Sequence, residues 1–101
     1  MSSAKDIVVR AVVYAVETAN PTLKSLLEFH LKTTTGKGYE LAYENPKEFK
    51  KAVSKLFGEY SGRLLELLVI GYFKDRIGLK DNIESLEDLV EYVKKIYGER
   101  K

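Results

Sequence analysis

The sequence predicts an all-α fold: a compact bundle of four main helices plus a possible short fifth, built around a central apolar helix at about 62–77. Apolar residues recur at helical spacing in successive segments, and most segments begin at capping residues and end at glycines. The one stretch that alternates as a strand would, residues 39–44, has no second strand to pair with. At 101 residues the chain is predicted to be one domain, residues 1–101.

The first helix is expected over about residues 4–18, although its many valines also suit a strand. Asp6, Arg10 and Glu17 decide between the two, because separations of four and seven place them on one stripe of a helix but on opposite faces of a strand. Ser3 stands where a helix cap is expected. Most of the circumference of this helix is predicted to be buried.

Two further helices are each expected to start at an Asn-Pro pair, Asn20-Pro21 and Asn45-Pro46. Asparagine accepts hydrogen bonds from the N–H groups of a first turn, and proline tolerates the first helical position. Behind each pair, five residues recur at the spacing i, i+3, i+4, i+7 and i+8, which is one face of a helix. They are Leu23, Leu26, Leu27, His30 and Leu31 after the first pair, and Phe49, Ala52, Val53, Leu56 and Phe57 after the second.

The connection between these helices reads TTTGKGYELAYE. Gly36 or Gly38 is expected to end the preceding helix, because glycine adopts the positive φ of a helix stop. The six residues 39–44 are expected to form a short helical turn or an extended connector. The segment TTTGKG lacks the order of a phosphate-binding loop and follows no buried strand, so its glycines are interpreted as loop and helix-stop residues.

The most apolar stretch, residues 62–77, is expected to form the next helix after a stop at Gly58 and a turn through residues 59–61. A helix that is apolar on all sides normally has neighbours on several sides, so we expect it at the centre of the bundle. Gly71 is expected to let another backbone approach closely. The large apolar residues of this helix are Leu64, Leu65, Leu67, Leu68, Val69, Ile70, Tyr72 and Phe73.

A last helix is expected after Gly78, capped by Ser85 and ended by Gly98. Acidic residues gather around its start: Asp81, Glu84, Glu87, Asp88 and Glu91. Their spacing is not that of the twelve-residue calcium loop, and acidic side chains are stabilising in a first helical turn. The sequence therefore favours a structural role for this cluster and leaves a further role open.

The residue content of the chain excludes several classes of functional site and indicates where the protein works. Cysteine is absent, which excludes disulfides, cysteine nucleophiles and zinc thiolate sites. The amino terminus lacks the pattern of a secretory signal, and the uncharged apolar run at 67–73 is far shorter than the roughly 20 residues of a membrane span. A cytoplasmic protein is predicted, with no membrane association. The lack of glutamine beside abundant lysine and glutamate is typical of a hyperthermophile.

The only histidine, His30, is the first candidate for proton transfer because its ordinary pKa lies near neutrality. It occupies an apolar helix face and has no partner nearby in the sequence, so we interpret it as a hydrogen-bonded structural residue, with a further role left open. No catalytic residue, cofactor or metal site is predicted.

A lysine ridge is expected on the outer face of the helix that starts at Asn45-Pro46: Lys47, Lys50, Lys51 and Lys55. It could contact nucleic-acid phosphates if this helix and the next formed a helix-turn-helix. The would-be recognition helix is mostly leucine, valine and isoleucine, and the charge of the chain is nearly balanced, 17 basic against 15 acidic residues. A solvated face is therefore the favoured interpretation.

The run FKKAVSKLFGEYSGRLLELLVIGYFKDRIGLK, together with LLEFHLK and ENPKEF before it, resembles the small helical output domain first named from Nitrosopumilus signalling proteins. The resemblance covers about residues 4–80. Its turn Tyr60-Ser61-Gly62 departs from the smaller residues expected there. The resemblance implies an all-α module of archaeal signal-transduction chains with no established chemistry, so no catalytic residue carries over.

The function predicted from these observations is a non-enzymatic protein-interaction or regulatory module, similar to a signal-output domain and able to self-associate. A homodimer is slightly favoured over a monomer, with Tyr60, Leu68 and Tyr72 as candidate interface residues. The alternative is weak DNA or RNA binding through the lysine ridge, and an enzyme ranks third. The sequence does not identify the protein partner or the signal.

Overall fold

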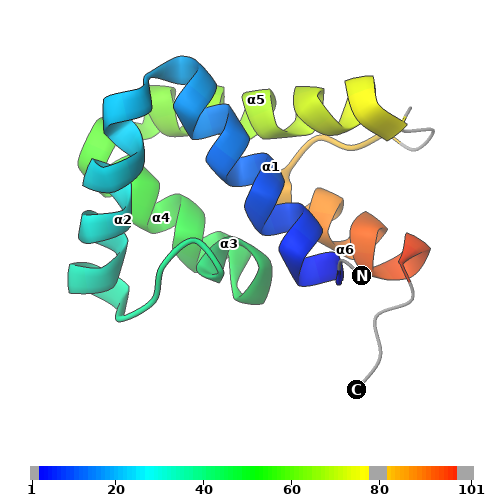
Figure 1. Ribbon diagram of the computed structural model, residues 1–101, viewed down its shortest axis with the longest axis horizontal. Helices are drawn as coiled ribbons and strands as arrows, with labels where there is room; N and C mark the ends of the chain where they lie inside the picture. The colour runs from blue at the N-terminus through cyan, green and yellow to red at the C-terminus, as the bar shows by residue number, and fades with distance from the viewer. Residues whose placement is uncertain (1–2, 78–81, 98–101) are drawn as a thin grey trace.

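The computed structural model describes residues 3–77 and 82–97, and every regular element within these ranges is a helix. Figure 1 shows their arrangement. The described residues form α1 (Ala4–Ala19), α2 (Pro21–Thr35), α3 (Leu41–Glu44), α4 (Pro46–Phe57), α5 (Glu59–Ile77) and α6 (Leu86–Ile96). The predicted all-α class is confirmed. The predicted count of four main helices plus a short fifth is wrong, because five long helices are present besides the one-turn α3.

Four of the predicted helix starts are confirmed in atomic detail. Each of the four predicted caps accepts a hydrogen bond from a backbone N–H group in the first turn of its helix: Ser3, Asn20, Asn45 and Ser85. At the other end of α2, Gly36 has a φ of 79°, the left-handed conformation that favours glycine. The expected stops at Gly78 and Gly98 lie outside the described residues.

The boundary between α4 and α5 differs from the prediction. Gly58 has a φ of 94° and ends α4, as expected, but the predicted turn over residues 59–61 is helical, so α5 begins at Glu59. This single glycine with a positive φ redirects the chain without a longer turn.

α1 and α4 form the centre of the molecule. α1 packs against α2, α3, α5 and α6, and α4 also packs against these four helices. In Figure 1, α5 runs along the upper edge of the molecule rather than through its middle. The prediction of a central helix at 62–77 is therefore wrong, because α5 has neighbours on one side only.

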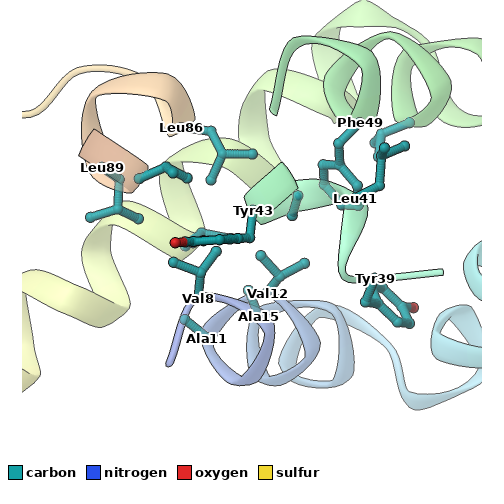
Figure 2. Close-up of a cluster of buried hydrophobic side chains, with 14 of the residues drawn as sticks. Val8, Ala11, Val12, Ala15, Tyr39, Leu41, Tyr43, Phe49, Leu86 and Leu89 are labelled. Atoms are coloured by element: carbon teal, nitrogen blue, oxygen red, sulfur yellow. The ribbon is translucent and has the colours of Figure 1, made fainter. Parts of the chain in front are cut away.

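The core is built on the small and β-branched face of α1. The prediction that most of the circumference of this helix is buried is wrong, because the residues on its other side are exposed. Its buried residues are Ala4, Val8, Ala11, Val12, Ala15 and Val16. α3 adds Leu41, Ala42 and Tyr43, and in Figure 2 the ring of Tyr43 lies among Val8, Leu86 and Leu89. A helix of one turn has little stability of its own, so burial of these three side chains stabilises α3.

Two glycines of α5 have different surroundings. A Cβ atom added at Gly62 would lie 2.7 Å from Ser54 Oγ, so Gly62 is where α5 approaches α4 closely. A Cβ atom at Gly71 would meet nothing within 4 Å. The predicted close backbone approach is therefore wrong for Gly71 within this chain. It occurs nearer the start of the same helix, at Gly62.

None of the helices within residues 3–77 and 82–97 is long and apolar enough to cross a membrane.

Candidate functional site

An apolar strip lies on the outer face of α5. It consists of Tyr60, Leu64, Leu67, Leu68 and Gly71, which we call the α5 strip. Their spacing of three, four and seven residues places them on one side of the helix. Tyr60 is 80% exposed, and the three leucines are 45–46% exposed. The opposite side of α5 carries the buried residues Val69, Ile70 and Phe73. Of the predicted interface residues, Tyr60 and Leu68 belong to the strip.

Two hollows border the α5 strip where α1 passes beside it. The first has a volume of about 290 Å³ and lies between α5 and the ends of α1, α2 and α4. All of its lining residues are apolar except Ser61. The second has a volume of about 350 Å³ and is lined by polar groups as well, among them Asp75 and Arg76. Leu68 lines both hollows, so it stands at the junction between them.

Tyr72, the third predicted interface residue, is part of a packed cluster beside the strip. Its ring centroid lies 4.8 Å from that of Tyr14 and 5.8 Å from that of Phe73. The guanidinium carbon of Arg76 lies 4.7 Å from the Tyr72 ring centroid, a cation–π distance. Replacing Tyr72 would disturb these contacts within one chain, so Leu67 is the better probe of an interface.

Charged residues stand at both ends of the strip. Glu59 lies in the first turn of α5, and Lys74 and Arg76 lie in its last turn. Asp75 lies beside them, and all four side chains are exposed. The start of α5 thus carries the acidic Glu59 and, one turn later, the exposed Arg63; its middle is apolar, and its end carries two basic residues and one acidic residue.

The face of α5 that points inward holds a polar group that the sequence analysis did not single out. Glu66 is only 6% exposed. Its Oε2 atom accepts hydrogen bonds from Lys50 Nζ at 2.9 Å and from the Leu86 N–H at 2.6 Å, and its Oε1 atom accepts one from Arg63 at 2.9 Å. Lys50 also donates to Glu87, at 2.7 Å. We call these four side chains the Glu66 network. It joins α4, α5 and α6.

Burial raises the pKa of Glu66, but the hydrogen bonds from Leu86, Lys50 and Arg63 and the charge of Lys50 outweigh burial and hold the pKa below its ordinary value. Burial likewise lowers the pKa of Lys50, and the bonds to Glu87 and Glu66 more than offset it. Both groups therefore stay charged at neutral pH. The signal that could have revealed the site was a lone glutamate inside an apolar run, which needs a partner if it is buried.

The predicted lysine ridge is only partly present. Lys47, Lys51 and Lys55 are exposed on α4, whereas Lys50 turns toward α5 and α6 and belongs to the Glu66 network. Three lysines thus remain for the nucleic-acid alternative.

The residues of the predicted acidic cluster have different partners and do not act together. Glu87 pairs with Lys50, and Glu84 accepts a hydrogen bond from Asn82. Asp88 accepts a hydrogen bond from the Glu84 N–H at 3.4 Å. Asp81 lies outside the described residues. In the described part of the chain, no group of three or more histidine or acidic side chains is arranged to hold a metal ion.

His30 lies partly buried between α2 and α4. Its Nε2–H group donates a hydrogen bond to the carbonyl oxygen of Ala52, at 2.9 Å. This contact agrees with the structural role that the sequence favours, and it joins two helices that start at equivalent Asn-Pro pairs.

Replacement of His30 by leucine is expected to lower the free energy of unfolding by about 1 kcal/mol, the typical net value of one hydrogen bond. Denaturant unfolding measures the change. His30→Gln, which keeps an N–H donor, should lose less. A His30→Leu variant that unfolds like the parent but loses partner binding would show that the residue has a functional role instead.

Residues 2–95 match the model of the family described as Nitrosopumilus output domain 5. Curated proteins give no match. The crystal structure of PH0832 from Pyrococcus horikoshii OT3 is similar, with 48% sequence identity and a TM-score of 0.91. The similarity covers 97% of this chain and 100% of that chain. The family match includes the residues on which the resemblance rested and extends through most of α6.

Proposed function

Because the chain belongs to the Nitrosopumilus output domain 5 family, we propose that it is a non-enzymatic interaction or regulatory module that binds a protein surface through the α5 strip. The observation that carries the proposal is the exposure of Leu64, Leu67 and Leu68 side by side on one helix. Single exposed apolar residues are common on protein surfaces, but contiguous apolar patches with polar ends mark interaction sites. The apolar hollow beside the strip adds a place for a partner's side chain.

Two of the buried titratable groups, Glu66 and Tyr39, support a role other than catalysis. Glu66 is held by three donors from α4, α5 and α6. Burial raises the pKa of Tyr39, and its hydroxyl donates to the carbonyl oxygen of Lys24 at 2.7 Å. Neither residue lines either of the two hollows beside the strip. Both groups join elements of the fold, which is a structural task.

The proposal predicts that partners contact the α5 strip more than other exposed helix surfaces. A photo-crosslinking amino acid placed at Leu67 should attach to protein partners in an extract of the source organism. The matched control is the same amino acid at Lys51, exposed on α4. The yield of crosslinked protein is expected to be several-fold higher at Leu67. Equal yields at the two positions, or none at Leu67, would contradict the proposal.

A further inference from the structure

The residues of the α5 strip fit a second copy of the same strip. We propose that two copies of this chain pair through α5 in antiparallel orientation, about a two-fold axis between Leu67 and Leu68, with Leu64 of each copy packed over Gly71 of the other. This inference rests on the proposed function and names the partner of that same surface. A two-fold interface uses one patch on both copies, so the patch must be complementary to itself.

The order of residues along the strip meets this condition. Leu64 stands three residues before Leu67, and Gly71 stands three residues after Leu68. A rotation that exchanges Leu67 with Leu68 therefore places Leu64 of one copy opposite Gly71 of the other, and it does so twice. At both ends of the central contact between leucines, the large side chain of Leu64 therefore faces Gly71, which has no side chain.

Gly71 provides the space that this packing needs. An added Cβ atom there would meet nothing within 4 Å in its own chain, so the outer surface of the glycine is open. The second hollow also borders Gly71 and gives a leucine from outside further room. Helix axes approach more closely where the contact residue is small, because the separation depends on the side chains between them. Without a second helix, the chain itself offers no packing reason for a glycine at this half-buried position.

Charge selects the antiparallel orientation. The start of α5 carries Glu59, and its end carries Lys74 and Arg76. Antiparallel pairing in this register sets Glu59 of one helix opposite Arg76 of the other, whereas parallel pairing would bring Lys74 near its own equivalent. Exposed charge pairs contribute little affinity, but they decide orientation and exclude wrong arrangements. The helix dipoles also oppose each other favourably in the antiparallel pair.

The test is the mass of the protein in solution, measured by sedimentation at several concentrations. The full chain is expected to reach twice its monomer mass as the concentration rises. Leu67→Lys places two like charges at the centre of the contact and removes two leucines from it, so the dissociation constant should rise by about 100-fold or more. A parent that stays monomeric at its highest soluble concentration would overturn the proposal.

The proposed alignment of the two helices, with Leu64 of one copy opposite Gly71 of the other, is tested by substitutions at Gly71. Gly71→Leu fills the space for the partner's Leu64 and should weaken association by about 100-fold or more, while circular dichroism shows an unchanged monomer. Lys51→Leu, which also adds a leucine to an exposed helix, should leave association unchanged. Adding Leu64→Ala to Gly71→Leu makes room again and should restore most of the association. A Gly71→Leu variant that dimerises like the parent would overturn the register.

The crosslink at Leu67 separates failure of this inference from failure of the proposed function. A crosslinked product of twice the chain mass, containing only this chain, supports the second copy. A product with a different protein and none with itself would overturn the inference while the proposed interaction function holds.

Discussion

Replacement of Glu66 by alanine is expected to lower the free energy of unfolding by about 3 kcal/mol, the lower end of the range for breaking a buried ion pair. The substitution leaves the Leu86 N–H without its acceptor and removes the carboxylate that Lys50 and Arg63 share. The loss should lie at the lower end because Lys50 and Arg63 are themselves partly exposed and regain contact with water. Denaturant unfolding followed by circular dichroism measures the change.

Two further variants show whether the loss in free energy of unfolding comes from the hydrogen bonds of Glu66. Glu66→Gln keeps an oxygen that can accept from Leu86 and should cost less than Glu66→Ala. Glu91→Ala removes an exposed acidic side chain from α6 and should change the free energy of unfolding by no more than about 0.5 kcal/mol. If Glu66→Ala unfolds at the same denaturant concentration as the parent, the Glu66 network does not hold α6 to the rest of the fold.

The same carboxylate gives stability a defined pH dependence. The pKa of Glu66 is lower in the folded state than its ordinary value of 4.5, so the folded protein binds this proton less readily than the unfolded chain. Its contribution is fully present above about pH 4.5 and is lost as the pH falls through the lower folded pKa. The stability difference between the parent and Glu66→Gln should therefore shrink below pH 4.5. A difference that stays constant down to the lowest pH would contradict this linkage.

Replacement of Phe73 by alanine is expected to lower the free energy of unfolding by about 3–5 kcal/mol, the range for deleting a buried aromatic ring. Phe73 is 2% exposed, and its ring packs edge-on against that of Tyr72. The matched control is Leu67→Ala on the same helix, at a position that is 45% exposed. In dilute solution, where association does not contribute, this control should cost about 1 kcal/mol or less.

The comparison tests how α5 is placed in the molecule. A large loss at Phe73 with a small loss at Leu67 means that α5 is buried on one face only. Equal losses in dilute solution would mean that the helix is covered on both faces, as the sequence predicted. Thermal unfolding at several protein concentrations completes the test, because only the dimer makes the melting temperature depend on concentration.

The sequence by itself determined the all-helical class and four of the helix starts. Ser3, Asn20, Asn45 and Ser85 each cap a helix through an N–H group two or three residues away, so a short window of sequence contains the whole interaction. The positive φ at Gly36 is equally local. The family resemblance was also recoverable, because it rests on a continuous run of residues.

Only the tertiary structure decided which face of α5 is buried. A helix with leucine, valine or isoleucine on nearly every side has no polar stripe, so its periodicity does not distinguish Phe73 from Leu67. The same limit applies to its two glycines, because only the position of Ser54 shows that Gly62 is crowded while Gly71 is open. Glu66 meets Lys50 and Leu86 across 16 and 20 residues of sequence. Such contacts depend on how the helices pack together, and the spacing of residues within one helix does not predict that packing.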